Sequence, residues 1–391
     1  MDNFTFHNTT KIIFGKGSEN RVGKEVSKYS KKILLHYGGG TIKKTGLYDR
    51  VVSSLKKSGV DYIELGGVNP NPKLSLVRDG IKICKENDIN FILAVGGGSV
   101  IDSSKAISIG ALYNGDVWDF YLGKARIKDS LPIGTILTIP AAGSESSTGS
   151  VITNEDGAYK RAVNSELIYP KFSILNPELA FTLPKYQVAS GSADILAHLM
   201  ERYFTNSQHV ELMDRIIEST MKTVINNVST VLSQADNYDS WAEIMWSGTV
   251  AHNNLLNTGR VGDWGSHDIE HELSGIYDVA HGAGLAVIFP AWMKYVYKHD
   301  INRFVQFAVR VWNVENSFNV PEKTAIEGIK KVEDFFKLIG LPTNLKELGI
   351  TDDRLEEMAS KATNSDSSTV GNFVKLGKED VYSILKLAQE K

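Results

Sequence analysis

The sequence predicts an α/β protein whose N-terminal half forms a parallel, doubly wound sheet and whose C-terminal half is entirely helical. Short apolar runs alternate with amphipathic helices up to about residue 180, an order that produces a parallel sheet with helices on both faces. Beyond Pro184 the strand-like runs disappear and long amphipathic segments follow. Asn176-Pro177 breaks the pattern between the two halves. We therefore predict an α/β domain over residues 1–180 and a helical domain over residues 181–391.

The predicted strands of the α/β domain are short and almost wholly apolar, as expected for strands buried on both faces. They cover residues 11–15, 32–37, 61–65, 91–95, 132–139 and 172–175. The helices between them carry apolar residues three and four positions apart, as at Leu74, Val77, Ile81 and Cys84. These helices cover residues 51–57, 74–87 and 100–112. Right-handed connections would bring the carboxyl ends of the strands, and any ligand, to one edge of the sheet.

The helical domain contains long segments whose apolar residues follow a helical period. They cover residues 192–204, 212–232, 241–256, 284–297, 326–339 and 380–389. Residues 363–369 form the most loop-like segment of this half.

The overall charge gives no bulk attraction to nucleic acid or to acidic lipid. Lys and Arg number 43 and Asp and Glu number 46, so the net charge is −3. No apolar run approaches the roughly 18 residues of a membrane span, and residues 1–7 show no basic segment followed by an apolar one. The single cysteine, Cys84, cannot form an internal disulfide. We expect a cytoplasmic protein with neither nucleic acid nor membrane as partner.

A glycine-rich turn, Gly96-Gly97-Gly98-Ser99, lies between the apolar run 91–95 and the next helix. Glycines there let the backbone approach a phosphate, and the N–H groups at the helix start favour an anion. The spacing is neither that of the GxGxxG fingerprint nor that of a Walker motif, so a plain tight turn is the alternative. A second glycine turn at residues 38–40 ends an earlier strand of the same sheet, and the pair favours a nucleotide site.

The second group of candidate functional residues is a cluster of histidines. Most histidines fall between residues 198 and 281: His198, His209, His252, His267, His271 and His281. Asp194 and His198 are four apart on a predicted helix and share one face, and His267 and His271 repeat that spacing. One Asp and three His from three segments of the chain suit Fe²⁺ or Zn²⁺. The alternative is that each His is merely hydrogen-bonded, which is our reading of His209, His252 and His299.

Five segments make the chain resemble a known family over nearly its whole length. They are residues 96–105, 138–145, 194–201, 262–272 and 278–286. Together they resemble the iron-containing (group III) alcohol dehydrogenases, most closely the clostridial-type butanol dehydrogenases. The resemblance implies the dehydroquinate synthase-like architecture, with a dinucleotide-binding α/β domain, a helical domain that binds the metal and catalyses, and an active site in the cleft between them.

The resemblance also implies roles for individual residues. The implied metal ligands are Asp194, His198, His267 and His281, and His271 would lie beside the metal without binding it. Gly97, Gly98 and Ser99 would cradle the coenzyme pyrophosphate. Asn71, Thr138, Ser147 and Lys160 would line the coenzyme cleft. The chain departs from the family at Ser147, where Asn is frequent, and at Asn176, where Asp is usual.

The residues that follow the predicted strand 32–37 bear on whether NAD(H) or NADP(H) is the preferred coenzyme. An acid at this place in dinucleotide folds binds the ribose 2′-hydroxyl and would repel a 2′-phosphate. This chain has Gly38, Gly39 and Gly40 followed by Thr41, and the next charges are the positive Lys43 and Lys44. We therefore expect NADP(H) to be favoured over NAD(H). Fe²⁺ is expected ahead of Zn²⁺ from the resemblance alone, because the ligand types do not separate the two metals.

The implied reaction is hydride transfer between the nicotinamide coenzyme and a short-chain primary alcohol or aldehyde, such as butanol or butanal. His271 is the candidate for moving the proton, and we expect a homodimer. Close alternatives are a glycerol dehydrogenase-like polyol oxidoreductase and a dehydroquinate synthase. A metal-dependent hydrolase, suggested by His267-Asp268, has no use for the glycine-rich half. An inactive nucleotide-binding scaffold has no need of four convergent ligands.

Overall fold

The computed structural model describes residues 1–351 and 354–389 and divides into two compact units. The first, called here the α/β unit, consists of His7–Leu183 and Asp236–Asn253. The second, the helical unit, consists of Met1–Phe6, Pro184–Ala235 and the described residues from Asn254 onward. Relative to the predicted division at residue 180, the first six residues and the segment 236–253 fall in the other unit.

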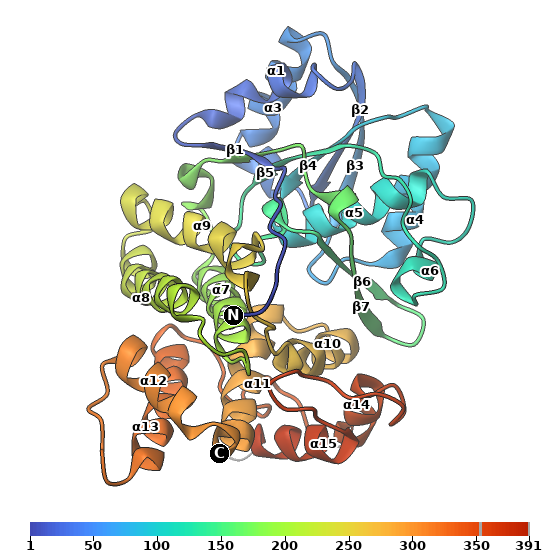
Figure 1. The fold of residues 1–391 in the computed structure, drawn as a ribbon. Coiled ribbons are helices and arrows are strands. Elements are labelled where there is room, and N and C mark those ends of the chain that lie inside the picture. Colours follow the sequence, from blue (N-terminus) through green and yellow to red (C-terminus); the bar gives the residue numbers. More distant parts are fainter. Residues whose placement is uncertain (352–353, 390–391) are drawn as a thin grey trace. The chain divides into compact units, whose positions relative to one another are not determined.

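The α/β unit is built on a sheet of six parallel strands among its described residues (Figure 1). The strands are β1 (Lys11–Phe14), β2 (Lys32–Gly38), β3 (Asp61–Val68), β4 (Ile92–Gly96), β5 (Ile133–Leu137) and β8 (Phe172–Leu175). Their order is β1-β8-β5-β4-β2-β3, with every neighbouring pair parallel. Each strand predicted from the sequence is present, and the doubly wound α/β fold is confirmed.

Helices cover both faces of this sheet because successive side chains of each strand point to opposite faces. On one face, α1 (Val22–Val26) and α3 (Leu47–Lys57) share a buried apolar cluster with Ile33 and Leu35 of β2. On the other face, α4 (Leu74–Glu86) and α5 (Gly98–Ala111) share a cluster with Leu34. The two clusters hold the sheet between helical layers.

A short antiparallel hairpin adds to the α/β unit and was not predicted. Its strands are β6 (Gly149–Asn154) and β7 (Tyr159–Asn164). The remaining elements of the unit are short helices and one long helix. They are α2 (Thr41–Lys44), α6 (Trp118–Tyr121), α9 (Tyr238–His252) and the 3₁₀ turns Ser18–Arg21, Ser144–Ser146, Glu166–Ile168 and Pro177–Ala180.

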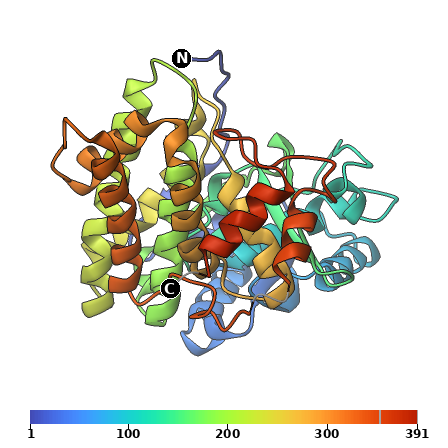
Figure 2. The ribbon, with the colours of Figure 1, turned by 90° about the horizontal axis from the view of Figure 1, so that it is seen from below.

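The helical unit contains the long helices predicted for the second half, apart from α9, together with α10, α12 and α14, which were not predicted. They are α7 (Lys185–Tyr203), α8 (Glu211–Ser233), α10 (Gly265–Tyr277), α11 (His281–Val296), α12 (Ile301–Trp312), α13 (Pro321–Leu338), α14 (Leu355–Ala362) and α15 (Lys378–Leu387), with 3₁₀ turns at Leu255–Asn257 and Tyr297–His299. Helix α7 packs against α8 and α11, and α12 lies beside α13 (Figure 2). Nearly every residue of α7 and α11 is buried, so these two helices form the centre of the unit.

Within residues 1–351 and 354–389, no helix combines the length and the apolar character that a bilayer span requires.

Candidate metal centre and coenzyme turns

The buried helix α7 carries the first two proposed metal ligands, Asp194 and His198. They lie one helical turn apart, so both side chains leave the same face of the helix. Asp194 Oδ1 is 3.6 Å from His198 Nε2, and each residue is only 4% exposed. Burial of an acid and an imidazole is costly unless each is hydrogen-bonded, paired or bound to a metal.

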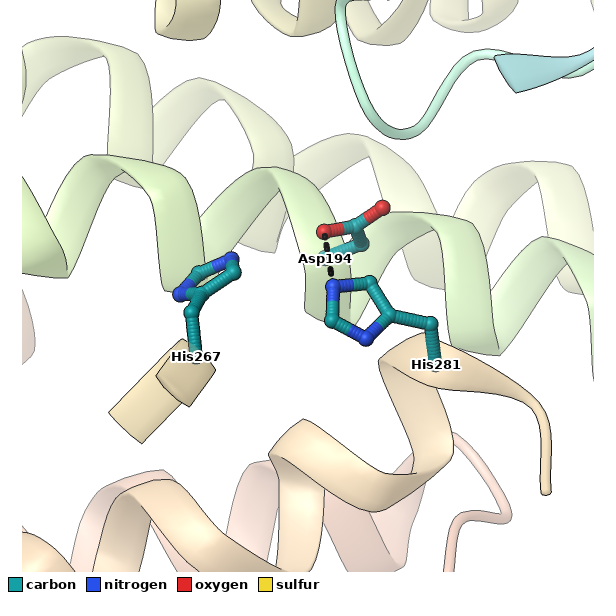
Figure 3. Close-up of side chains that lie close together, drawn as sticks. All are labelled: Asp194, His267 and His281. Carbon is teal, nitrogen blue, oxygen red and sulfur yellow. Dashed lines mark ion pairs between the residues drawn. The ribbon is translucent and has the colours of Figure 1, made fainter. Parts of the chain in front are cut away.

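Two other helices of the same unit bring further donors to this place. His267 lies in the first turn of α10, and His281 is the first residue of α11. The ligand atoms of Asp194, His267 and His281 all lie within 4.8 Å of one another. Figure 3 shows the carboxylate and the two imidazoles turned toward one region, with the dashed line marking the 3.9 Å between His281 Nε2 and Asp194 Oδ1.

His198 lies beside these three residues but is not among those whose ligand atoms all lie within 4.8 Å of one another. Its ring stacks on that of His267, with centroids 4.8 Å apart and 17° between the planes. A set of one carboxylate and two or three imidazoles suits Fe²⁺ and Zn²⁺ and does not suit Mg²⁺ or Ca²⁺, which prefer oxygen ligands. The residues therefore fit the metal that the sequence suggested.

Two buried glutamates orient the histidines, and sequence reasoning missed both. Glu201 Oε1 accepts from His267 N at 3.1 Å and is 2.8 Å from His267 Nδ1. Glu270 is hydrogen-bonded to His281 Nδ1 in the same way. Because Nδ1 of each ring is taken by a carboxylate, Nε2 is the nitrogen that would bind a metal. Glu201 follows Asp194 by seven positions, a spacing that places both on one face of α7 and that could have identified it.

Acids outnumber bases among the buried charged side chains around the site. Burial raises the pKa of Glu201 to about 8 and lowers that of the neighbouring Arg202 guanidinium to about 9. Burial, followed by the charge of Glu201, raises the pKa of Asp263 to about 7. A cation bound at the centre would favour the charged forms of these carboxylates.

Trp264 is the N-cap residue of α10, and its backbone has a conformation that bulky residues rarely adopt, with φ 72° and ψ −2°. Its N–H donates to Glu201 Oε2 at 2.5 Å, and its ring lies 4.7 Å from the Arg202 guanidinium. The same ring is 5.3 Å from that of His267. These contacts hold a strained residue against a proposed metal ligand, as is common at functional sites.

His271 lies one turn beyond His267 on α10 and is partly exposed. Its ring centroid is 5.6 Å from that of His281, and with Glu270 and His281 it forms a second group of donors within 4.8 Å. The structure thus places His271 beside the proposed metal ligands. Its assignment as a residue that does not bind the metal stays a prediction.

The two glycine turns lie at the carboxyl ends of β2 and β4, which are neighbours in the sheet. A Cβ on Gly97 would stand 3.1 Å from Ile139, and one on Gly98 would stand 3.0 Å from Ala142, so larger residues would crowd this turn. Ser99 follows in the first turn of α5. In the other turn, a Cβ on Gly39 would meet nothing within 4 Å. This arrangement is typical of a dinucleotide site.

The other predicted coenzyme residues lie in loops of the same unit. Asn71 accepts from Lys160 Nζ at 3.1 Å, and both residues are buried. Thr138 follows β5, and its N–H donates to Gly96 O at 3.0 Å. Ser147 is buried and accepts from Lys105 Nζ at 3.3 Å.

The positive charge expected to attract a 2′-phosphate is already engaged at Lys43. Its ammonium is 3.3 Å from Glu64 Oε2 and lies over the rings of Tyr37 and Tyr48, at 5.1 and 4.7 Å from their centroids. The sequence predicted that Lys43 attracts a 2′-phosphate. That prediction did not consider Glu64, which lies on the neighbouring strand β3 and pairs with Lys43. Gly38, Gly39 and Thr41 are placed as predicted, at the end of β2 and the start of α2.

Comparisons with known proteins cover both units. Residues 9–177 match the iron-containing alcohol dehydrogenase model, and residues 188–389 match the C-terminal model of the Fe-containing alcohol dehydrogenase family. A protein named probable NADH-dependent butanol dehydrogenase 1, from Bacillus subtilis, is 46% identical over 386 residues, 99% of each chain. The NADPH-dependent aldehyde reductase YqhD of Escherichia coli is 35% identical over 377 residues, 95% of each chain.

A solved structure agrees with the fold. The NADH-dependent butanol dehydrogenase A of Thermotoga maritima has a TM-score of 0.96 and 41% identity, and the match covers 100% of this chain and 99% of that one. The similarity therefore includes the sheet, the glycine turns and the helices that carry the histidines. The chain belongs to the iron-containing alcohol dehydrogenase family.

Proposed function

We propose that this NAD(P)-dependent alcohol dehydrogenase and aldehyde reductase acts on short-chain primary alcohols and aldehydes, with butanol and butanal as the reference pair. The observation that supports this most is the convergence of Asp194, His267 and His281, with a buried glutamate on Nδ1 of each histidine. Two of the similar proteins carry butanol dehydrogenase in their names and a third is named an aldehyde reductase, which supports the choice of substrate class.

We assign the metal to Asp194, His198, His267 and His281, with Fe²⁺ ahead of Zn²⁺. A divalent cation held there supplies polarisation of the substrate oxygen. The nicotinamide coenzyme supplies the hydride. The protein contributes geometry, because Glu201 and Glu270 fix the ring orientations and thereby the position of whatever binds between the rings.

The protein must also bind the coenzyme and move a proton. We assign pyrophosphate binding to the turn of Gly97, Gly98 and Ser99, where the first N–H groups of α5 lie. His271 is the proposed proton carrier, since an imidazole titrates near neutral pH and this one lies next to the metal ligands.

We propose that NADP(H) is used in preference to NAD(H). Gly39 provides no carboxylate at the end of β2, and the space beside it is open, which is compatible with a 2′-phosphate. Thr41, at the start of α2, supplies a hydroxyl near this place. The similar proteins differ here, one being named NADPH-dependent and others NADH-dependent, so the preference must be measured on this chain.

A homodimer in the cytoplasm completes the proposal. Phe14 of the edge strand β1 and Trp246 of α9 are both more than 40% exposed, and their rings pack together at 6.4 Å. We propose that this exposed pair contributes apolar surface to the dimer contact. Light scattering on the purified protein tests the dimer.

The test of the proposed function is a substrate panel on iron-reconstituted protein, followed through the absorbance of the reduced coenzyme. Butanal and other short aldehydes should be reduced far faster than dihydroxyacetone, which a glycerol dehydrogenase-like enzyme would take. The His267→Ala variant should lose most of its iron and activity while it keeps its fold. Preference for the polyol substrate would refute the assignment.

A further inference from the structure

A fully buried cation, Lys105, lies on α5 just beyond the phosphate turn. It has 0% exposure, and its ammonium donates to the carbonyl oxygens of Ser144, Ser147 and Gly149 at 2.7, 2.9 and 2.8 Å. An ammonium has three protons, which the three short bonds to backbone oxygens use, and the hydroxyl of Ser147 at 3.3 Å shares one of them. Burial lowers the pKa of Lys105 to about 8. The desolvation of this charge costs free energy that an apolar side chain at the same position would not cost.

Asp102, one turn earlier on α5, holds the other end of the same loop. Its carboxylate accepts from Val151 N at 3.0 Å and from the hydroxyl of Ser144. Its backbone carbonyl accepts from Ser150 Oγ at 2.8 Å. Asp102 and Lys105 together therefore fix the segment 144–151 at several points along its length.

This segment connects to the other residues proposed to bind the coenzyme. It contains Ser147 and continues into the hairpin β6–β7, which carries Lys160 with its hydrogen bond to Asn71. The hairpin is also held by Thr153 N, which donates to Pro72 O at 2.8 Å. At its other end, α5 begins in the phosphate turn.

We propose that Asp102 and Lys105 are positioning residues for the coenzyme, which set the loop of Ser147 and the hairpin of Lys160 at a fixed distance from the phosphate turn. The inference rests on the proposed function. Neither side chain needs to touch the coenzyme, because both act through the backbone that they hold.

The test replaces Lys105→Met, which keeps the side-chain length and removes the ammonium, and Asp102→Asn, whose amide leaves one of two donors without an acceptor. Dissociation constants for NADPH and NADH, from quenching of tryptophan fluorescence, should rise about tenfold or more, equivalent to about 1.4 kcal/mol. The KM for coenzyme should rise likewise, while kcat at saturating coenzyme, the KM for butanal and the iron content stay near the wild-type values. Amide exchange in segment 144–151 should accelerate.

Ser104→Ala is the matched control, because Ser104 is a buried neighbour on α5 whose hydroxyl donates to Val100 O of the same helix at 2.8 Å. It should leave coenzyme affinity unchanged. If Lys105→Met does not fold, Asp102→Asn and Ser144→Ala decide the matter, since each removes a smaller part of the network. Folded variants with wild-type coenzyme affinity would overturn the inference. Failure of the wild-type protein to bind either coenzyme would instead refute the proposed function.

Discussion

Replacing Glu201 with Gln tests whether a buried carboxylate sets the orientation of a metal-binding histidine. Glu201 Oε1 serves His267 twice, through the backbone N at 3.1 Å and Nδ1 at 2.8 Å, and Oε2 accepts from Trp264 N at 2.5 Å. Gln offers one oxygen and one NH₂ group. Whichever way the amide is turned, the NH₂ group faces an N–H donor, so at least one of these hydrogen bonds is lost.

The structure permits an estimate of the effect. Loss of one buried hydrogen bond to a charged group costs about 1–3 kcal/mol. Removal of a residue that orients a metal ligand typically weakens metal binding about 10–100-fold, which corresponds to about 1.4–2.8 kcal/mol. The two ranges agree, so we expect the Glu201→Gln variant to bind Fe²⁺ about 10–100-fold more weakly than the wild type.

The assay is competition for Fe²⁺ with a chromogenic chelator, combined with kcat/KM at saturating iron. Glu218→Gln is the control, because Glu218 is also a buried carboxylate of the helical unit but accepts from Tyr203 OH at 2.9 Å and does not contact the proposed ligands. The control should lose stability without losing iron affinity. Equal iron affinity in Glu201→Gln and wild type would refute the orienting role.

Three further predictions concern proton transfer, coenzyme choice and acid stability. His271→Ala should lower kcat by about tenfold to a thousandfold with unchanged iron content, whereas a loss of iron would make His271 a ligand. Gly39→Asp should move the ratio of kcat/KM for NADPH and NADH by about tenfold toward NADH, or about 1.4 kcal/mol; an unchanged ratio would show that this turn does not read the 2′ position. Burial lowers the pKa of His36 from 6.5 to about 4, so the unfolded chain takes up the proton first as the pH falls. Up to about 3 kcal/mol of stability, present above pH 6.5, is therefore lost toward pH 4. Denaturant unfolding should show a weaker pH dependence in His36→Gln, and the same dependence in both proteins would contradict this origin.

The main sheet could be predicted because its strands are buried on both faces and read as apolar runs. The hairpin β6–β7 lacks this signal, since its strands are short and largely polar, although Asp156-Gly157 in its turn is a hairpin signature. Helix α10 was not among the predicted helical segments, although the spacing of His267 and His271 indicated one helical turn there. Many of its residues are polar, because one side of it supplies His267, Glu270 and His271.

Periodicity could not predict whether a given helix packs in the α/β unit or in the helical unit. The period of α9 shows a helix with a buried face but does not say which partner covers that face. In the structure α9 belongs to the α/β unit, where Thr249 Oγ1 donates to the buried Glu145 at 2.6 Å. Such a contact joins residues 104 positions apart, beyond the reach of a local pattern.

Part of the candidate site follows from local spacing and part does not. The helical period places Asp194 and His198 together, whereas the approach of His267 and His281 depends on how α7, α10 and α11 pack. Spacing alone left their convergence open, and only the resemblance implied it.

The two departures from the family pattern have local explanations in the structure. Asn176 Nδ2 donates to the buried Glu19 at 2.9 Å, and an Asp there would set two carboxylates against each other. Ser147 accepts from Lys105 through both its hydroxyl and its carbonyl oxygen. Both partners are distant in sequence, so the departures could be noticed from the sequence but not explained by it.

The central claim is that a metal held by Asp194, His198, His267 and His281 is required for coenzyme-dependent reduction of a short aldehyde. The most direct measurement starts from chelator-treated protein, shown to be metal-free by elemental analysis, and adds Fe²⁺ stepwise while the oxidation of NADPH by butanal is followed. Turnover should be negligible without metal and should rise to a plateau at one iron per chain, and His267→Ala should not respond. Full turnover by the metal-free protein, or a plateau reached equally by His267→Ala, would contradict the account.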